Sequence, residues 1–278
     1  MSASSEPNDV APVDYDAVTR TQQATWSEGD FHEIARQNVV MAEALCTALD
    51  PHAGQRVLDV ACGSGTAALV VARRYCDVTG IDYVPALIDR ARQRAQVEGY
   101  SVEFRVGDAQ ALPFPDATFD AVVSVYGMQF APDQEQAARE LVRVCRPGGR
   151  IGLASPMPEG WSGEWFATHA RYAPPPPGLP SPLRWGSEEG VAKLLGEGAR
   201  SIESRPCQAF QYYRSVGHAV EVFSTYFGPT LRALALLDAD TQQQFRHDLE
   251  TVFTRHNRAT DGTAMIENTY LQTMVTRQ

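Results

Sequence analysis

Two hydrophobic periods alternate along the middle of the chain. Short apolar runs typical of buried strands cover residues 56–61, 78–81, 102–106, 119–125 and 150–154. Helical spacing lies between them, over residues 67–75 and 85–97 and after Asp133, which has Gln136 three positions on, as a helix N-terminus often does. Alternating strands and helices predict a parallel sheet covered by helices on both faces, an α/β doubly wound fold.

Helical patterns also flank this region. Apolar residues recur at helical spacing from 15 to 49, so we expect residues 1–50 to form an N-terminal helical segment before a domain over 51–278. The prolines at 174–177 predict an extended connector, because proline fixes φ and lacks an N–H donor.

The last hundred residues continue the pattern with a long helical stretch. We expect a helix over 188–195, an extended stretch over 207–213 and a closing strand over 270–276. Apolar residues at i, i+4, i+7 and i+8 within 215–262 predict a helical cap inserted between the last two strands: Phe245, Leu249, Val252 and Phe253.

The net charge and the composition disfavour several classes of function. The chain has 34 acidic and 24 basic residues and a net charge of -10, which disfavours nucleic acid as a partner. Neither a secretory signal pattern nor an apolar run of membrane-spanning length is present, so we expect a cytoplasmic protein that does not bind membranes. Five cysteines without a C-x-x-C pair indicate neither a disulfide framework nor a metal site, and the sequence is compatible with a monomer or a homodimer.

A glycine-rich turn follows the first predicted strand. Gly63 and Gly65 would let the backbone turn tightly and a ligand approach closely before the helix that follows. Gly63-x-Gly65-x-x-Ala68, with Asp82 roughly 20 residues on, also satisfies a dinucleotide-binding fingerprint. The motif alone therefore leaves two cofactor classes open.

The acidic residue in front of the turn separates the two classes. Asp59 stands at the strand end where a dinucleotide would place its doubly negative pyrophosphate. At about 6 Å and an effective dielectric constant near 20, each like-charge pair costs on the order of 3 kcal/mol. S-adenosylmethionine has no phosphate and carries a sulfonium and an ammonium, so Asp59 favours this cofactor, while Asp82 can accept hydrogen bonds from both ribose hydroxyls.

A third acidic position agrees with this interpretation. Asp108 and Ala109 follow the next strand, where the carboxylate can accept from an adenine amino group and a backbone amide can donate to the ring. The ends of parallel strands share one edge of a sheet, so we expect Asp59, Asp82 and Asp108 to lie around one crevice. Each aspartate taken singly also fits a helix cap or a turn.

Five ordered motifs resemble those of class I methyltransferases of the ubiquinone/menaquinone-biosynthesis type (methyltransferase type 11). They are Leu58-Asp59-Val60-Ala61-Cys62-Gly63-Ser64-Gly65, Gly80-Ile81-Asp82, Gly107-Asp108-Ala109-Gln110-Ala111-Leu112-Pro113-Phe114, Phe119-Asp120-Ala121-Val122-Val123-Ser124 and Arg143-Val144-Cys145-Arg146-Pro147-Gly148-Gly149-Arg150. The resemblance implies a Rossmann-like sheet of seven strands in the order 3-2-1-4-5-7-6, with the last strand antiparallel.

The resemblance also implies a set of residues that bind S-adenosylmethionine. Those expected at the methionine moiety are Asp59, Ala61, Gly63 and Gly65. Those expected at the ribose, the adenine and the edge of the cofactor are Asp82 with Tyr83, Asp108 with Ala109, and Ser124 with Tyr126. Ala61 departs from the family, which usually has glycine there, and alanine fits if its φ is negative.

The sequence contains fewer signals for the methyl acceptor than for the cofactor. Methyl transfer is an in-line displacement that needs alignment more than a base, so no catalytic residue is assigned. Tyr126 and Gln129 follow the fourth strand, and His32 or His169 could remove a proton from a phenol, although each also fits a structural role. Aromatic residues that suit an apolar acceptor pocket, or equally a packed core, are Trp26, Phe31, Trp161, Trp165, Phe166, Tyr172, Trp185, Phe223, Tyr226 and Phe227.

These observations favour an S-adenosylmethionine-dependent methyltransferase of a small molecule, such as a quinone, a polyketide or another natural product. The alternative is an enzyme of the same fold that binds this cofactor and catalyses another reaction, such as cyclisation or decarboxylation. An NAD-dependent oxidoreductase is disfavoured by Asp59, and a ligand-binding protein without catalysis stays open.

Overall fold

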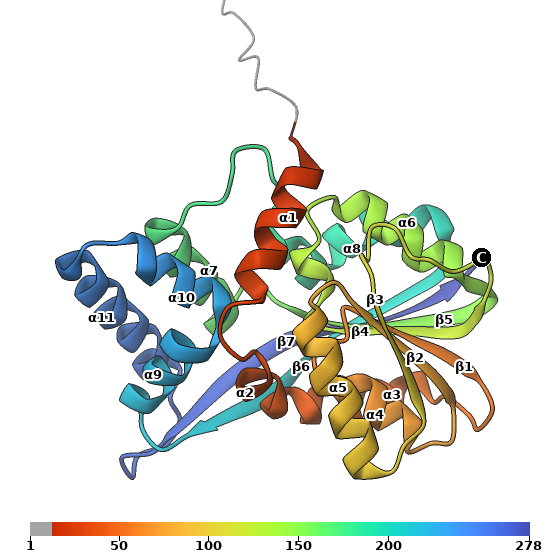
Figure 1. The fold of residues 1–278 in the computed structure, drawn as a ribbon, viewed down its shortest axis with the longest axis horizontal. Coiled ribbons are helices and arrows are strands. Elements are labelled where there is room, and N and C mark those ends of the chain that lie inside the picture. The colour runs from red at the N-terminus through yellow and green to blue at the C-terminus, as the bar shows by residue number, and fades with distance from the viewer. Residues whose placement is uncertain (1–12) are drawn as a thin grey trace, which may run out of the picture.

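The computed structural model describes residues 13–278 and contains one seven-stranded sheet (Figure 1). The strands are β1 (Arg56–Val60), β2 (Asp77–Asp82), β3 (Val102–Val106), β4 (Phe119–Val125), β5 (Cys145–Pro156), β6 (Ala199–Tyr213) and β7 (Ala264–Arg277). Their order is β3-β2-β1-β4-β5-β7-β6, and β7 pairs antiparallel with both β5 and β6. The predicted fold class is confirmed, including the antiparallel last strand.

Helices cover both faces of the sheet and extend beyond one end of it (Figure 1). The α-helices are α1 (Tyr15–Trp26), α2 (His32–Ala35), α3 (Val39–Leu49), α4 (Thr66–Ala72), α5 (Pro85–Glu98), α6 (Gln134–Val144), α7 (Gly160–Tyr172), α8 (Glu188–Leu195), α9 (Val216–Tyr226), α10 (Gly228–Leu236) and α11 (Ala239–His256). Short 3-10 helices are η1 (Arg36–Asn38), η2 (Met128–Phe130), η3 (Pro182–Gly186) and η4 (Gly196–Gly198). No helix among residues 13–278 is both long enough and apolar enough to span a bilayer.

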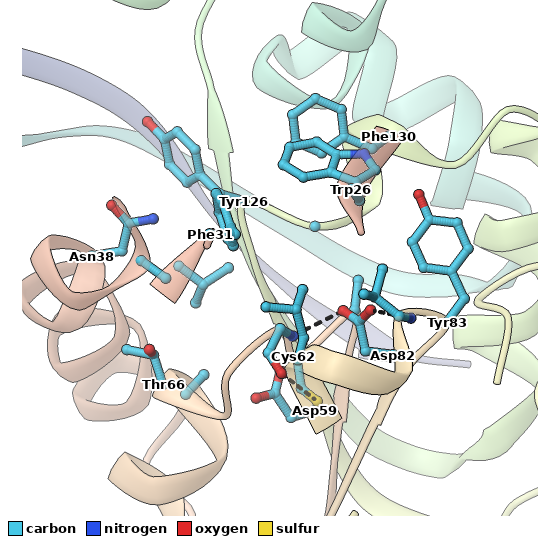
Figure 2. A pocket seen from close by; sticks show the side chains of 18 residues that line it. Trp26, Phe31, Asn38, Asp59, Cys62, Thr66, Asp82, Tyr83, Tyr126 and Phe130 are labelled. Carbon is cyan, nitrogen blue, oxygen red and sulfur yellow. Dashed lines mark hydrogen bonds between the residues drawn. The ribbon is translucent and has the colours of Figure 1, made fainter. Parts of the chain in front are cut away.

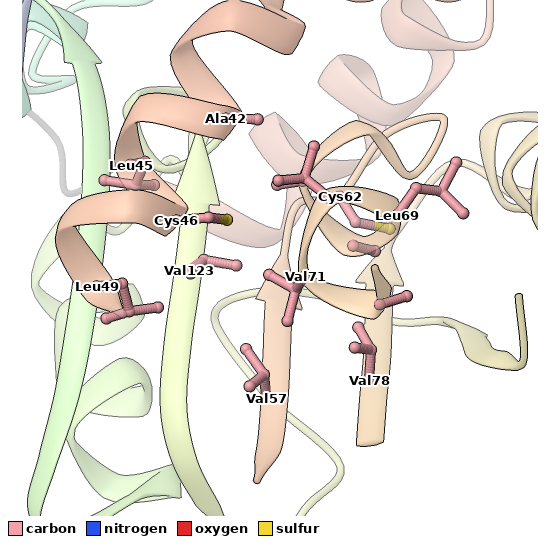
Figure 3. Close-up of a cluster of buried hydrophobic side chains, with 14 of the residues drawn as sticks. Ala42, Leu45, Cys46, Leu49, Val57, Cys62, Leu69, Val71, Val78 and Val123 are labelled. Carbon is pink, nitrogen blue, oxygen red and sulfur yellow. The ribbon is translucent and has the colours of Figure 1, made fainter. Parts of the chain in front are cut away.

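One face of the sheet is buried by α3, α4 and α5. Leu45 and Leu49 of α3 and Val71 of α4 point toward Val57 and Val123 on the strands (Figure 3). The α4 sequence, Thr-Ala-Ala-Leu-Val-Val-Ala, is buried along its whole length, because β strands lie on one side and α3 on the other. This face holds the β1–α4 turn against the sheet.

A third layer of helices forms beside the carboxyl ends of the strands. Helices α9, α10 and α11 follow one another between β6 and β7, and they pack against α7 and α1 (Figure 1). Their common core is rich in aromatic side chains, among them Trp161, Trp165, Phe223, Phe227 and Phe253. The first twelve residues of the predicted N-terminal segment lie outside the described residues.

Helix α7 has no counterpart among the elements that the sequence predicts. Gly160 and Gly163 lower its intrinsic helix propensity. Packing explains the second glycine, since a Cβ at Gly163 would lie 1.7 Å from the carbonyl oxygen of Pro158. The helix therefore depends on its tertiary contacts, which a local pattern does not report.

The last two strands are longer than predicted, since they begin at Ala199 and Ala264 instead of 207 and 270. The first half of β6 lies at the edge of the sheet and is mostly exposed, so it lacks the apolar alternation of a buried strand. Its pairing with β7, from Ala199 opposite Arg277 to Tyr213 opposite Ala264, makes it a strand.

The turn between β1 and α4 is built from left-handed residues. Ala61 has φ 53°, Gly63 φ 54° and Gly65 φ 80°. The condition of a negative φ at Ala61 is therefore not met. The Cys62 amide still donates to the Ile81 carbonyl of β2 at 3.0 Å, and the chain then turns, with the Gly65 amide donating to the Cys62 carbonyl at 2.9 Å. A left-handed alanine costs roughly 1–2 kcal/mol, which the fixed turn offsets.

Gly65 packs closely against Phe104 of β3 and Ala91 of α5, and replacing it with alanine tests this packing. A Cβ there would lie 2.9 Å from Cζ of Phe104 and 3.1 Å from Cβ of Ala91, whereas a Cβ at Gly99, with φ 75°, would meet nothing within 4 Å. Both Gly65→Ala and Gly99→Ala should lose about 1 kcal/mol of unfolding free energy for the left-handed backbone. Gly65→Ala should lose about 1–3 kcal/mol more through overpacking, measured by urea denaturation. Equal losses would show that Phe104 moves aside freely.

Candidate functional site

A cavity of about 640 Å3 opens at the carboxyl ends of β1, β2 and β4. Asp59 and Asp82 stand on its floor, and Trp26, Phe31 and Asn38 from the N-terminal helices face them from the other side (Figure 2). The N-terminal segment thus closes a crevice that the sheet opens. We call it the floor cavity.

Asp59 is a buried carboxylate, with 1% of its surface exposed. Its Oδ2 accepts a hydrogen bond from the Ala68 amide at 2.8 Å, which fastens α4 to the end of β1. Burial raises the pKa of Asp59 to about 8, the Ala68 N–H lowers it and the charge of Asp82 raises it. Among residues 13–278 no basic side chain pairs with Asp59, so it is a site that a cation would stabilise.

Asp82 fixes the glycine turn from the neighbouring strand. Its Oδ2 accepts from the Gly63 amide and its Oδ1 from the Val84 amide, both at 2.9 Å (Figure 2). Burial raises its pKa to about 6, and the two N–H donors oppose this rise. Each oxygen keeps a further lone pair, so the carboxylate can accept hydrogen bonds from a ligand as well.

A second cavity, of about 380 Å3, continues the first along the strand ends. It shares Asp82 and Tyr83 with the floor cavity and adds Asp108 and Ala109. Asp108 holds its own loop, because its Oδ1 accepts from the Gln110 amide at 2.9 Å. The three aspartates that the sequence placed at successive strand ends thus lie around one crevice.

Eight of the ten predicted binding residues line these two cavities. They are Asp59, Ala61, Gly63, Asp82, Tyr83, Asp108, Ala109 and Tyr126. The other two, Gly65 and Ser124, line neither cavity. Gly65 begins α4 beside Phe104, and the Ser124 hydroxyl donates to the Val60 carbonyl at 2.7 Å, which joins β4 to β1.

Tyr126 closes one wall of the floor cavity with an unusual backbone. Its φ is 55°, in the left-handed region, directly after β4. Its phenol lies 3.2 Å from Oδ1 of Asn268, and burial raises its pKa well above the ordinary value. Tyr126 is therefore a neutral hydrogen-bonding wall at physiological pH.

An aromatic cavity of about 480 Å3 lies on the far side of Tyr126. It shares Phe31, Asn38, Tyr126 and Phe130 with the floor cavity, so the two adjoin. Its remaining walls come mainly from α7, α9 and η2, with one residue each from α2 and β6, and include Trp161, Trp165, Phe223 and Gln129. Asn38 and Gln211 are cavity residues that the sequence analysis missed. Asn38 directly follows two other polar residues, Arg36 and Gln37, so no local pattern marks it.

The two candidate histidines lie in different places. His32 Nδ1 is 3.0 Å from the Ser64 hydroxyl, and burial followed by the charge of Arg94 lowers its pKa. His169 lines a further cavity beside α7, where burial lowers its pKa to about 4. His32 lines none of the four cavities described here.

Comparisons with known proteins agree with this geometry. A family model described as a methyltransferase domain matches residues 58–153. The protein Rv1405c of Mycobacterium tuberculosis is 38% identical over 221 residues, which cover 78% of this chain and 81% of Rv1405c. Demethylmenaquinone methyltransferase of Deinococcus radiodurans is 39% identical over 138 residues, covering 48% of this chain and 55% of that protein.

Solved structures share the fold at lower identity. A putative methyltransferase from an antibiotic biosynthesis pathway of Anabaena variabilis has a TM-score of 0.60 at 18% identity, covering 86% of this chain and 97% of that one. The [4+2]-cyclase SpnF has a TM-score of 0.52 at 20% identity, covering 95% and 94%.

The motifs, the strand order and the relatives all indicate the same family. The chain belongs to the class I S-adenosylmethionine-dependent methyltransferase family, in the group that carries the methyltransferase domain matched here.

Proposed function

We propose that the protein binds S-adenosylmethionine along the three aspartates and transfers its methyl group to a small molecule in the aromatic cavity. The observation that carries this proposal is the shared wall: Phe31, Asn38, Tyr126 and Phe130 line both the floor cavity and the aromatic cavity. The two cavities adjoin at these residues, so a ligand in one would lie next to a ligand in the other.

The residues present fit this cofactor. Asp59 is a buried carboxylate with a raised pKa and no cationic partner in the described chain, which suits a ligand that carries an ammonium and a sulfonium. Asp82 offers two carboxylate oxygens for ribose hydroxyls, and Asp108 with Ala109 lies one strand further along for the adenine. A dinucleotide would place its pyrophosphate, and no cation, beside Asp59, so it would not stabilise the charged form of this carboxyl.

The bound cofactor would supply an activated methyl group. The chain's own residues would then align the acceptor and exclude water, which can contribute about 7–11 kcal/mol of the barrier through orientation alone. Trp26 and Phe31 cover the floor cavity, and a dry environment strengthens the electrostatic contacts inside it. Tyr126, as a neutral phenol, orients an acceptor oxygen and does not act as a base.

The pKa of Asp59 gives the first test of the cofactor site. Without ligand this carboxyl has a pKa of about 8, so below pH 8 it is largely protonated and must lose its proton to pair with a cation. Affinity for S-adenosylmethionine should therefore rise with pH between 5.5 and 7.5, by close to tenfold per pH unit. Isothermal titration calorimetry at several pH values measures it.

Two variants serve as test and control for this pH dependence. Asp59→Asn keeps an oxygen that can accept from Ala68 but has no proton to lose, so its affinity should be low and nearly independent of pH. Asp77→Asn changes an exposed residue at the other end of β2 and should behave as the wild type. An equally steep pH dependence in Asp59→Asn would place the cation elsewhere.

The alternative is a reaction of the same fold without methyl transfer. Its support is the likeness to the cyclase SpnF, which is a likeness of fold alone. Incubation with methyl-labelled cofactor and a metabolite extract separates the two, since transfer moves label into a new product. We expect labelled product that is lost in Asp82→Asn, which loses a charged acceptor for the ribose hydroxyls, and kept in Asp77→Asn. Product formation without label would favour the alternative.

The cap gives a test of the acceptor side. Phe223 is 2% exposed and lines the aromatic cavity, whereas Tyr226, one turn further along α9, is 36% exposed and lines none of the four cavities. Phe223→Leu should raise the Michaelis constant of the acceptor or change acceptor choice while cofactor affinity stays unchanged. Tyr226→Ala should change neither, so a matching shift in acceptor kinetics there would contradict the assignment. Melting temperatures of both variants separate this effect from a loss of packing.

A further inference from the structure

One face of helix α1 lies along the crevice that the three aspartates surround. Thr19, Gln23 and Trp26 stand at i, i+4 and i+7 in α1, so their side chains share one side of the helix. Thr19 Oγ1 accepts a hydrogen bond from Gln110 Nε2 at 3.0 Å, and Gln23 Nε2 donates to the Tyr83 carbonyl. Gln110 and Tyr83 line the second cavity, and Trp26 lines the floor cavity. Helix α1 therefore contacts the walls of both cofactor cavities.

The side chain of Gln110 joins three separate parts of the chain. Its Nε2 donates to Thr19 of α1, and its Oε1 accepts from the amide of Asp133, the N-cap of α6, at 2.8 Å. The same Nε2 lies 3.0 Å from Oδ2 and 3.2 Å from Oδ1 of Asp108. Because Oε1 meets an N–H group and Nε2 meets only acceptors, the partners settle the orientation of this amide.

The loop that carries Asp108 has little regular structure to hold its side chain. Residues 107–118, between β3 and β4, form neither a helix nor a strand. Asp108 is half-buried in this loop, and its Oδ1 also accepts from the Gln110 amide at 2.9 Å. A side chain on an irregular loop keeps rotamer freedom unless contacts remove it. Here both the main chain and the side chain of Gln110 fix the Asp108 carboxylate.

These contacts restrict where the Asp108 carboxylate can accept another hydrogen bond. Oδ1 already accepts from two N–H groups of Gln110, whereas Oδ2 accepts from one. A carboxylate oxygen has two lone pairs, so Oδ2 keeps one for a further donor. Asp108 lines the second cavity, and a ligand there would bind Oδ2 through an N–H group. A carbonyl oxygen at the same position would be repelled.

We infer that Gln110 is a positioning residue that gives the site its selectivity for the adenine base, and that α1 holds Gln110 in place through Thr19. The inference rests on the proposed function, which assigns Asp108 to the adenine amino group. Adenine has an amino donor on its six-membered ring, whereas hypoxanthine has a carbonyl oxygen at the same carbon. A carboxylate that Gln110 aims at this group accepts from adenine and disfavours hypoxanthine. Base selectivity then depends on α1 being docked.

Two ligands that differ only in the base test this selectivity. They are S-adenosylhomocysteine and S-inosylhomocysteine, titrated by calorimetry into the full chain. The wild type should bind the adenine ligand about tenfold more tightly or better, because a hydrogen bond to a charged acceptor is lost with the other base. Both ligands share the ribose and the amino acid, so the ratio of the two dissociation constants reports the base alone. Equal affinities would overturn the inference.

The role of Gln110 is tested with a substitution of nearly the same shape. Gln110→Glu should lower the preference for adenine about threefold or more. Two adjacent carboxylates share a proton, and a protonated carboxyl can donate to the hypoxanthine oxygen. Gln93→Glu makes the same change at an exposed position of α5 and should keep the wild-type preference.

A merely structural role of Gln110 would give a different result. Both ligands would then lose affinity by the same factor in Gln110→Glu, and their ratio would stay at the wild-type value. That outcome, in a variant whose melting temperature shows that it folds, would overturn the inference.

The contribution of α1 is tested at Thr19. Thr19→Val keeps the shape of the side chain and removes the oxygen that accepts from Gln110, so the preference for adenine should fall about twofold or more. Thr21→Val is the matched control, because Thr21 lies on the exposed side of α1 and its hydroxyl donates only to the Ala17 carbonyl. Equal preferences in the two variants would show that α1 does not act on the base through Gln110.

The two proposals fail in distinguishable ways. If the wild type binds neither ligand, the proposed function and this inference fail together. If it binds S-adenosylhomocysteine and Gln110→Glu keeps the full preference for adenine, the cofactor assignment stands and the role of Gln110 is overturned.

Discussion

The shape of the site depends on hydrogen bonds from backbone amides to two buried carboxyl groups, those of Asp59 and Asp82. Asp59 bonds to the first turn of α4, and Asp82 bonds to the glycine turn and to the start of α5. Burial raises the pKa of both groups, so keeping them charged costs free energy that the protein alone does not recover. A cationic ligand would recover part of it, and the same contacts that shape the turn would then select the ligand.

This constraint explains the strained residues around it. Ala61 and Tyr126 both have positive φ, and both lie directly after strands that end at the floor cavity. Left-handed alanine and tyrosine are unfavourable, and such residues persist only where the surrounding structure fixes them. Here the backbone bonds of Cys62 and Tyr126, to Ile81 and Ala154, fix them to neighbouring strands. Two of the five left-handed non-glycine residues in the described chain therefore lie where the crevice opens.

Charge is separated between the two sides of the site. Aspartates line the floor cavity and the cavity that continues it, while the aromatic cavity beyond Tyr126 has no Asp, Glu, Lys or Arg among the described residues that line it. The sheet provides the first side through strand ends, and the helices α1, α7 and α9 provide the second through side chains that pack on one another. Such a division allows the aromatic cavity to vary in sequence without disturbing the turn that the aspartates hold.

The sequence by itself predicted the sheet and the placement of three aspartates, because apolar periodicity reports burial and the ends of parallel strands meet at one edge. The strand order was implied by the resemblance of five motifs to a known family. It also indicated aromatic residues that suit an apolar pocket or a packed core, but not which of them meet. Only the tertiary structure brought Trp26 and Phe31 to the floor cavity, formed α7 despite its glycines and assigned Gly65 and Ser124 to packing between elements. The physical reason is that a local pattern specifies which side of an element is buried. What it is buried against depends on how separate layers pack, and this decided the φ of Ala61, the position of Gln129 and the shape of the aromatic cavity.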